Sequence, residues 1–484
     1  MTSITRHVIF CGGLVAAALI LPSFAVQAES LSECQELLRT GQYEQCAVAT
    51  GTAIENRSYG EEWPMLKVQA ELALGRYEDA AATVALGIER YSWSVRLRMM
   101  EHTTARALGK PEQAAAALTE IERLVSGASW RYTDADDLVS LGHAALALGA
   151  DPRDVQEGFF ERARRNYKTR PDGFLAAGQL AIEKGDAQLA AEILGPAAKE
   201  FETNPEIQFA LSEAMRAADR TVSAELLQKT LEINPHFAPA LQRLAESRID
   251  AEDYTAAQEI LQQMLTTNPN SPPAHALLAV IHHLQYDKEA ETAAVAAATK
   301  FSGPSAPVFH LIGERLSRKY RFAEAAHWQR QALDADPTFH PAQAQLAQDL
   351  LRLGQETEGW ELADQAHKAD GYSTTLYNLL KLKVSLDQFT TLTSEHFELR
   401  MEQREAQIYG QQALLLLEEA YRQTTERYQF EPTGPIVVEV FPRADDFAVR
   451  TFGLPDVAGF LGVCFGRVIT ANSPASRRDN PSNW

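Results

Sequence analysis

The sequence predicts a mainly α-helical protein, in which a long solenoid of paired helices is followed by an incomplete α+β domain. Two observations predict this fold class. Between Ala238 and Gly371 one unit occurs four times in nearly constant register, with small residues at two fixed positions and a turn between them. After Thr390 the helical periodicity gives way to alternating apolar and charged residues, a pattern that is typical of a half-buried strand.

The repeated unit is clearest in the stretch that opens at Ala238. Its eighth residue is Ala245, its twentieth is Ala257, and it ends with Asn268-Pro269. Small residues at those two positions let two antiparallel helices approach closely, and the Pro cannot continue the second helix. The spacing resembles the tetratricopeptide repeat (TPR), a helix–turn–helix of about 34 residues. A TPR unit buries its apolar stripe against its neighbours, so the resemblance implies an α-solenoid.

The array of units is predicted to cover residues 29–371 and to be most regular over 238–371. The later units open at Pro272, Ala306 and His340, and the copy at Pro272 is degenerate. Weaker copies precede Ala238, and together they predict about ten helix pairs. Residues 372–389 are predicted to hold a capping helix, from Thr374 to Leu386, and a linker.

We expect the first helices of successive units to line a concave face that binds protein or peptide partners. The exposed positions of these helices in the regular stretch are Gln242, Glu246, Asp250, His310, Glu314, Arg318, Gln348 and Arg352. They form a mixed polar surface, without the Lys and Asn pattern by which some TPR domains hold a terminal carboxylate. His275, His282 and His283 lack a carboxylate at helical ligand spacing, so ordinary surface or inter-helix histidines are expected there instead of a metal site.

Residues 1–28 are predicted to be a signal peptide. Arg6 precedes an apolar run from Val8 to Phe24, and Val26-Gln27-Ala28 offers small residues of the kind that signal peptidase requires. The run is short for a membrane span, and the later sequence offers no second one. We expect cleavage after Ala28 and export, to a periplasm or to the exterior; an uncleaved anchor is the alternative.

The chain is strongly acidic. Its formal net charge is −20, distributed along the predicted helices. A surface of this sign repels phosphate backbones and anionic lipids, so nucleic acid and membrane surfaces are not expected as partners.

A disulfide between Cys34 and Cys46 is predicted. Alignment of Gly41-Gln42-Tyr43 with the turn of the repeat places these cysteines at the eighth and twentieth positions, where the paired helices touch. An exported protein forms such bonds readily, and this one would brace a terminal unit that has only one neighbour. Two separate buried thiols are the alternative. Cys464 is left over and is expected to be a small buried side chain.

The last stretch, residues 390–484, is predicted to be an incomplete α+β domain. Its expected elements are a strand over His396–Met401, a helix over Glu405–Tyr428, a strand over Pro435–Phe441, a short helix that ends at Gly453, and a hairpin over Phe460–Ala471 with Gly466 first in its two-residue turn. The apolar face of the long helix is expected to carry Ala406, Tyr409, Ala413, Leu417, Ala420, Thr424 and Tyr428.

This stretch resembles the opening of a peptidase-MA-like domain, the gluzincin class of zinc metallopeptidases. The residues that carry the resemblance are His396-Phe-Glu-Leu-Arg400, Pro435-Ile-Val-Val-Glu-Val-Phe-Pro442, Asp446-Phe447 and the run from Gly459 to Thr470. The resemblance implies a following helix with the motif HExxH, whose histidines bind zinc and whose Glu activates water. It also implies that the hairpin strands Leu461–Cys464 and Val468–Asn472 are candidates to pair with an extended substrate, with plain sheet structure as the alternative.

The motif HExxH does not occur in the sequence. Asp479-Asn480-Pro481 is typical of a helix start close to the last residue, Trp484, so we expect a chain cut before its metal-binding helix. No catalytic, cofactor or metal residue is therefore assigned, and zinc is expected only if the full-length protein carries HExxH.

Three functions stay open at this point. The first is an exported TPR scaffold that binds protein or peptide partners. The second is the N-terminal part of an active zinc-dependent endopeptidase whose catalytic helix lies beyond residue 484. The third is a metal-free, degenerate peptidase fold that is used for binding.

Overall fold

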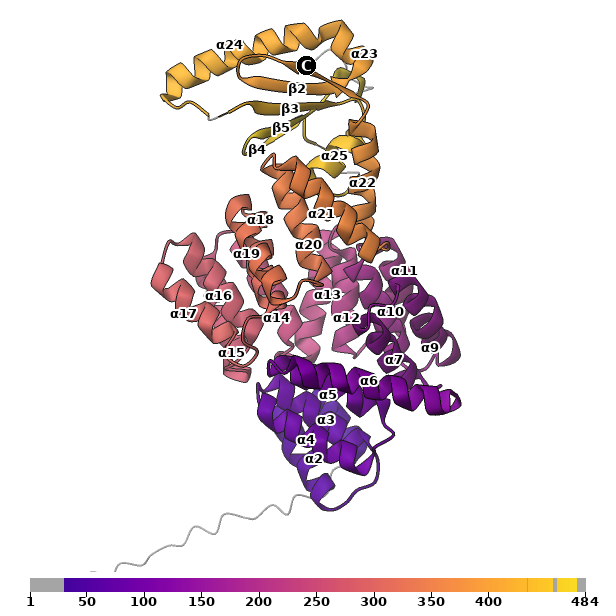
Figure 1. The fold of residues 1–484 in the computed structure, drawn as a ribbon. Helices are drawn as coiled ribbons and strands as arrows, with labels where there is room; N and C mark the ends of the chain where they lie inside the picture. The colour runs from indigo at the N-terminus through magenta and orange to yellow at the C-terminus, as the bar shows by residue number, and fades with distance from the viewer. Residues whose placement is uncertain (1–29, 433, 456–458, 477–484) are drawn as a thin grey trace, which may run out of the picture.

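The computed structural model describes residues 30–432, 434–455 and 459–476. Within these residues ten successive helix pairs lead into a small mixed sheet (Figure 1). The predicted fold class and the predicted number of helix pairs are confirmed. The predicted signal peptide, residues 1–28, lies outside the described residues, as does the predicted helix start at Asp479.

The helices of the array have the following bounds. The first helices of the pairs are α1 (Leu31–Arg39), α3 (Glu62–Ala73), α5 (Val95–Ala107), α7 (Ala135–Ala147), α10 (Asp172–Glu183), α12 (Pro205–Met215), α14 (Ala238–Asp250), α16 (Pro272–Leu284), α18 (Ala306–Arg318) and α20 (His340–Arg352). The second helices are α2 (Tyr43–Glu55), α4 (Tyr77–Arg90), α6 (Pro111–Ala128), α11 (Ala187–Glu200), α13 (Arg220–Ile233), α15 (Tyr254–Thr267), α17 (Lys288–Ala298), α19 (Phe322–Ala335) and α21 (Glu356–Ala369). In the fourth pair the second helix consists of α8 (Pro152–Val155), a π-helical turn (Gln156–Phe160) and α9 (Glu161–Asn166), and a 3₁₀ turn (Ser129–Arg131) precedes that pair.

The small positions of the repeat lie where the helices of a pair cross. Ala245 and Ala257 are fully buried between α14 and α15. The caps follow from the sequence as well, because the Asp253 carboxylate accepts from the Ala256 amide at the start of α15. Asn268 ends α15 in an extended conformation, which turns the chain into the next unit.

The array winds into a superhelix whose first turn meets its second. In Figure 1 the helices α2 to α6 lie next to α13, α14 and α15, and hydrogen bonds join the two groups. The linked residues Tyr43 and Asn234 are 191 positions apart, and Tyr77 and Asn268 show the same separation. We call the line of contact between the two turns the seam.

A five-stranded sheet follows the capping helix of the array, α22 (Thr374–Leu386), which has the predicted bounds. Its strands are β1 (Phe389–Thr393), β2 (Phe397–Glu402), β3 (Ile436–Phe441), β4 (Gly462–Phe465) and β5 (Val468–Asn472), in the order β1-β2-β3-β5-β4. The pairs β1–β2 and β4–β5 are antiparallel, whereas β2–β3 and β3–β5 are parallel. The remaining helices are α23 (Gln403–Glu405), a π-helical turn (Ala406–Gly410), α24 (Gln411–Tyr428), α25 (Ala444–Phe452) and a 3₁₀ turn (Pro474–Ser476).

The strand β2 alternates as its sequence predicts, with Phe397, Leu399 and Met401 buried against α24. The structure differs from the prediction for this region in two respects. The edge strand β1 was not predicted, because its threonines give a weak apolar pattern. The predicted apolar face of α24 is also wrong in the C-terminal part of the helix. There Ala420, Thr424 and Tyr428 are exposed, and Tyr421 packs toward the sheet.

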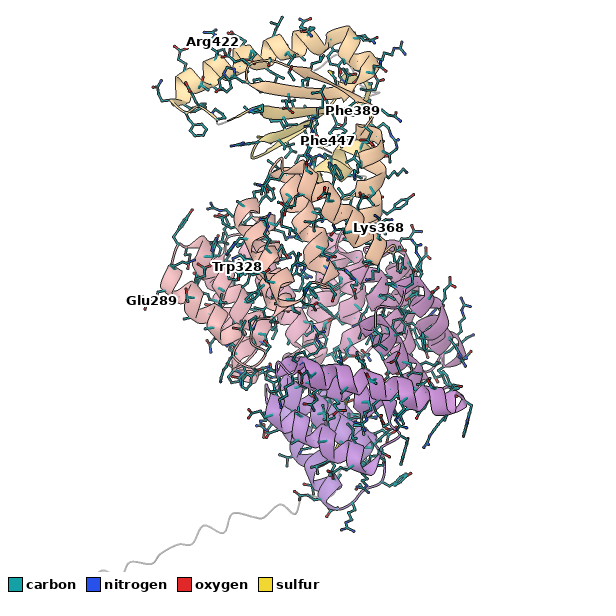
Figure 2. All side chains as sticks on the ribbon, in the orientation of Figure 1. Glu289, Trp328, Lys368, Phe389, Arg422 and Phe447 are labelled. Atoms are coloured by element: carbon teal, nitrogen blue, oxygen red, sulfur yellow. The ribbon has the colours of Figure 1, made fainter. Side chains whose placement is uncertain are left out.

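The sheet is attached to the solenoid by a shared core. Phe389 of β1 and Phe447 of α25 lie together between the sheet and the last helices, with Leu379 and Leu382 of α22 in the same cluster (Figure 2). At the hairpin, the Phe465 ring stacks on Tyr320 with 5.5 Å between the ring centres. The α+β segment therefore continues the solenoid without a free linker.

Candidate partner-binding site

Several of the predicted concave-face residues take part in ion pairs, mostly with arginines that were not predicted to lie on this face. Glu246 of α14 is 3% exposed, and its Oε2 lies 3.2 Å from Nη1 of Arg315 on α18. Arg315, itself 2% exposed, also pairs with Glu314 at 2.6 Å. Because the first helices converge toward the superhelix axis, side chains from units that are not neighbours in sequence reach each other. This part of the inner wall is closed by buried charges.

The same ion cluster extends to α12 through Arg243. Its guanidinium pairs with Glu213 at 2.6 Å and also with Glu246. Burial lowers the pKa of Arg243, but the carboxylates of Glu246 and Glu213 outweigh this effect, so that the pKa is raised overall. Asp250 and Arg318 close the cluster on its outer side at 3.3 Å, where both are partly exposed.

Two other predicted residues belong to the junction with the sheet. Arg352 lies over the rings of Phe322 and Phe465, and its Nη1 is 3.4 Å from Asp349 Oδ1. Gln348 lies beside Gly453 at the end of α25. The α+β segment therefore lies against this end of the predicted face, where Arg352 and Gln348 are partly buried.

The seam is built from one hydrogen bond that recurs one repeat length later. The Asn234 amide donates to the Tyr43 hydroxyl at 3.1 Å, and the Asn268 amide donates to the Tyr77 hydroxyl at 3.2 Å. Each Tyr begins a second helix of the first superhelical turn, and each Asn ends a second helix of the second turn. Burial raises the pKa of both tyrosines, so each keeps its hydroxyl proton at neutral pH.

The Tyr–Asn bond does not recur a third time along the seam. One repeat length after Tyr77 the chain has Pro111, and one repeat length after Asn268 it has Ser302. Neither residue can reproduce the Tyr–Asn bond, although Gly109 still lies against the main chain of Ser302. The series of Tyr–Asn bonds between the two turns is therefore interrupted here.

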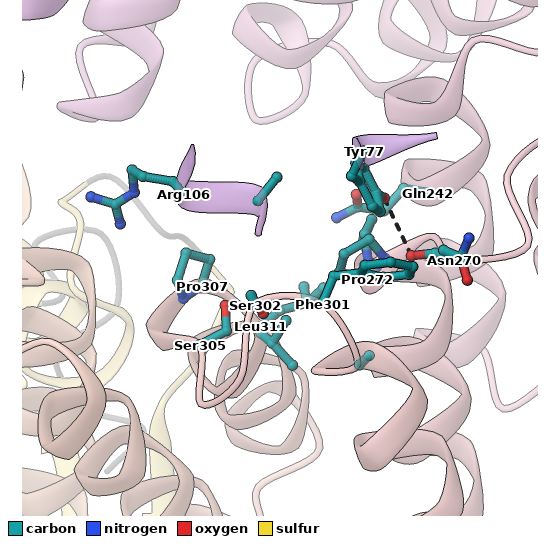
Figure 3. Close-up of a pocket in the computed structure, with 14 residues that line it drawn as sticks. Tyr77, Arg106, Gln242, Asn270, Pro272, Phe301, Ser302, Ser305, Pro307 and Leu311 are labelled. Carbon is teal, nitrogen blue, oxygen red and sulfur yellow. Dashed lines mark hydrogen bonds between the residues drawn. The ribbon is translucent and has the colours of Figure 1, made fainter. Parts of the chain in front are cut away.

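A pocket of about 470 Å³ opens at this interruption (Figure 3). The first turn contributes Tyr77, Arg106 and Ala107. The second turn contributes Gln242, Asn270, Pro272, Pro273, Ala298, Phe301, Ser302, Ser305, Pro307, Val308 and Leu311. Most of these side chains are apolar, and the prolines are rigid, so the pocket is formed without a bound ligand. Of the predicted concave-face residues, Gln242 is the one that lines it.

The walls of the pocket are held in place by contacts across the seam. The Tyr77 hydroxyl donates to the Asn270 main-chain oxygen at 3.2 Å, shown as the dashed line in Figure 3. The Tyr77 ring meets Phe301 edge to face with 5.3 Å between the centres. Arg106 stands at the rim, where its side chain is 52% exposed and 3.9 Å from Asp336. Its guanidinium is therefore available to a further anion.

Two of the three histidines that the sequence singled out make ordinary hydrogen bonds. Nε2 of His275 is 2.9 Å from the Pro269 oxygen, and Nδ1 of His283 is 3.0 Å from Glu291 Oε1. In the described part of the chain, no group of three or more His, Cys, Asp or Glu side chains is arranged to hold a metal ion. Among the same residues, no helix is both long and apolar enough to cross a membrane.

The cysteines of the first unit lie where the repeat places them. Cys34 in α1 and Cys46 in α2 are both fully buried, and Cys46 Sγ is 3.4 Å from the Cys34 main-chain oxygen. Their pairing stays a prediction. The expectation for Cys464 is wrong, because it lies exposed on β4, where its side chain points away from the core.

Of the two hairpin strands that were candidates for pairing with a substrate, only one lies at an edge of the sheet. β5 lies between β3 and β4 and is hydrogen-bonded on both sides, so Val468–Asn472 cannot accept another strand. β4 is an edge strand, and its outer side is open within the described residues.

Comparison with known proteins identifies the repeat. A family model described as tetratricopeptide repeat matches residues 223–281, from α13 into α16. No curated protein matches the chain. Among solved structures, the chain is similar to a chain of the "Crystal structure of APC/C hetero-tetramer Cut9-Hcn1", with 14% identity and a TM-score of 0.43. The match covers 64% of this chain and 60% of that one, so this chain spans less than two thirds of its length. The family match confirms the predicted TPR unit within residues 223–281.

Proposed function

We propose that this tetratricopeptide-repeat protein is an exported scaffold that binds a segment of a partner protein through the pocket at the seam. The observation that carries the proposal is the pocket itself, whose aromatic and proline walls stand beside one exposed guanidinium. Pockets of this size with few polar groups bind a large apolar side chain and fix its orientation. The partner segment therefore presents an aromatic or leucine side chain to the pocket.

The polar groups of the pocket specify the rest of the segment. Arg106 at the rim suits a carboxylate next to the anchoring side chain. The Ser305 hydroxyl caps no amide of α18, and it lines the pocket as a free polar group for the backbone of the partner. An acidic residue adjacent to a bulky apolar residue is the expected motif.

The ion cluster of α12, α14 and α18 supports the choice of the seam over the predicted concave face. Glu246 and Arg315 already form an ion pair with each other. A ligand that bound either group would have to break this pair and leave a buried charge without its partner, which is unfavourable.

Export rests on the N-terminal sequence, where Arg6 and the apolar run before Ala28 are typical of a signal peptide. The net charge of −20 is consistent with a soluble scaffold. Expression in a bacterial host and N-terminal sequencing of the exported protein test this part. A mature chain that begins at Glu29 supports it, and a protein retained with Met1 contradicts it.

The binding proposal is tested with a display library of short peptides and two matched variants. Ser305→Trp fills the pocket from a position whose side chain makes no capping bond, and Ser126→Trp adds the same bulk at an exposed site of α6. We expect selected peptides that combine Phe, Tyr, Trp or Leu with a neighbouring Asp or Glu. Their binding, measured by fluorescence polarisation, is lost in Ser305→Trp and kept in Ser126→Trp. Equal binding to both variants would place the site elsewhere.

The α+β segment supports a second candidate, an exported zinc-dependent endopeptidase of which this chain is the N-terminal part. Its elements follow the predicted order of strand, long helix, strand, short helix and hairpin, and β4 offers a free edge to an extended substrate. The described residues assemble no zinc site, so no catalytic step is assigned to them. Zinc analysis of the product of the complete gene separates this candidate from a metal-free degenerate peptidase fold that is used for binding.

A further inference from the structure

The seam differs in kind from the contacts that hold neighbouring units together. Within the described residues, all extensive contacts between helices of the array join helices of the same or adjacent units. The two superhelical turns instead meet through loops and helix ends, by polar contacts and by the ring contact of Tyr77 with Phe301. Besides the two Tyr–Asn bonds, these include Arg39 with the Thr203 oxygen, Arg153 with the Gly371 oxygen at 2.8 Å, and Lys184 with Asp370 at 2.8 Å.

Such contacts are weak relative to the stacking of the units. A hydrogen bond contributes about 0.5–1.5 kcal/mol net, whereas the apolar interfaces between units carry the stability of a solenoid. A separation of the two turns needs only a small rotation at each of the intervening units, and the core of each unit stays intact. The seam is therefore the part of the array that opens at the lowest cost.

The pocket lies across the seam. Tyr77 and Arg106 belong to the first turn, whereas Phe301 and Pro307 belong to the second turn. A side chain that fills the pocket contacts both walls only when the turns are together. Its binding free energy is thus larger for the closed superhelix than for an open one, and by linkage it shifts the array toward the closed form.

We propose that the seam is a reversible closure that the pocket ligand controls: a partner segment holds the two turns of the superhelix together, and the Tyr43–Asn234 and Tyr77–Asn268 bonds set the balance in its absence. This inference rests on the proposed function for the identity of the ligand site. The ligand class is the same, a segment with a bulky apolar side chain next to a carboxylate.

A backbone amide far from the pocket reports on the closure. The Thr374 amide donates to the Lys184 oxygen at 3.0 Å across the seam, and neither residue lines the pocket. The Ala257 amide serves as a control, since its acceptor is the Asp253 oxygen of the same unit. Hydrogen exchange of the two amides therefore separates opening of the seam from unfolding of a unit.

The experiment compares the wild-type chain with the double variant Tyr43→Phe/Tyr77→Phe, which keeps both rings and removes both seam hydroxyls. We expect exchange at Thr374 to be at least about tenfold faster in the variant, with Ala257 unchanged, since three hydrogen bonds across the seam are removed: the two Tyr–Asn bonds and the bond from Tyr77 to the Asn270 oxygen. A selected peptide that binds the pocket is expected to slow exchange at Thr374 severalfold in the wild-type chain.

The outcomes distinguish the two proposals. If a peptide binds and Ser305→Trp abolishes its binding, but exchange at Thr374 does not respond to it, the closure is refuted and the binding function stands. If no peptide binds, the proposed function fails, and the double variant still tests the seam. Unchanged exchange at Thr374 in that variant would show that the Tyr–Asn bonds do not set the closure.

Discussion

Glu439 of β3 and Arg450 of α25 form an ion pair with 2.7 Å between Oε2 and Nε, and neither side chain is more than 2% exposed. Glu356 of α21 and Arg400 of β2 surround the pair, with 2.6 Å between them. Arg450 also donates to the Leu351 oxygen of the solenoid at 3.2 Å. The buried carboxylate of Glu439 in the sheet is thus neutralised by Arg450, at the boundary between the sheet and the last helix pair.

Removal of Arg450 is predicted to destabilise the α+β segment more than removal of both partners. Arg450→Met leaves the Glu439 carboxylate buried without its main partner and is expected to cost about 3–5 kcal/mol. In Arg450→Met/Glu439→Gln no uncompensated charge remains there, so part of the loss is restored. Urea unfolding monitored by the tryptophans and by circular dichroism measures both. A double variant that is less stable than Arg450→Met would contradict the assignment.

Asp349 is predicted to contribute less to the stability of the protein as the pH rises from about 4 to 6. This carboxyl is fully buried, and burial raises its pKa to about 6, against the opposing effects of Arg352, Ser317 and Gln345. Between the unfolded pKa of 3.8 and the folded pKa of about 6, the folded chain binds the extra proton. Protonation therefore stabilises the fold at the lower pH, by about 3 kcal/mol in total.

Asp349→Asn isolates this contribution. The amide does not titrate, so the variant is expected to lose stability less steeply than the wild type over the same pH interval. Thermal midpoints measured in one buffer series from pH 4 to pH 7 provide the comparison. Parallel profiles for the two proteins would assign the pH dependence to other groups.

The Cys34–Cys46 disulfide is predicted to form in the exported protein and to stabilise the first unit. Closing a loop of this length contributes about 2–3 kcal/mol in the chain-entropy model. Peptide mapping without reductant should recover the two cysteines as one linked peptide, and reductant should lower the thermal midpoint. The control Cys34→Ala/Cys46→Ala should be insensitive to reductant. Alkylation of both thiols in the unreduced wild type would refute the bond.

Gly75→Ala is predicted to weaken the seam. Gly75 has φ +72°, which an L side chain adopts at a cost, and a Cβ at this position would collide with the Asn268 side chain. We expect a loss of about 1–2 kcal/mol and a faster exchange of the Thr374 amide. Gly127→Ala is the matched control, because a Cβ there meets nothing within 4 Å. A Gly75→Ala protein with wild-type stability and wild-type exchange at Thr374 would contradict this prediction.

Local features of the chain could be predicted from the sequence because their causes are local. The small residues Ala245 and Ala257, the closing Asn268-Pro269 and the bounds of the capping helix follow from helix crossing and helix termination within one unit. The hairpin turn at Gly466 was predicted for the same reason, since its φ of +60° is a conformation that glycine adopts without strain. The single strand missed in the sheet, β1, has a threonine-rich sequence whose pairing with β2 depends on the neighbouring strand.

What the sequence by itself determined is the unit: paired helices, their number, and a strand-rich segment after them. Tertiary structure alone decided how the units close on one another. The winding of a superhelix is the sum of small rotations between neighbours, so no residue pattern within one unit indicates that Tyr43 meets Asn234, 191 positions away. The same winding brings Glu246 to Arg315 and buries both, which turns predicted ligand contacts into an internal ion cluster. It also opens the candidate pocket where Pro111 and Ser302 interrupt the seam.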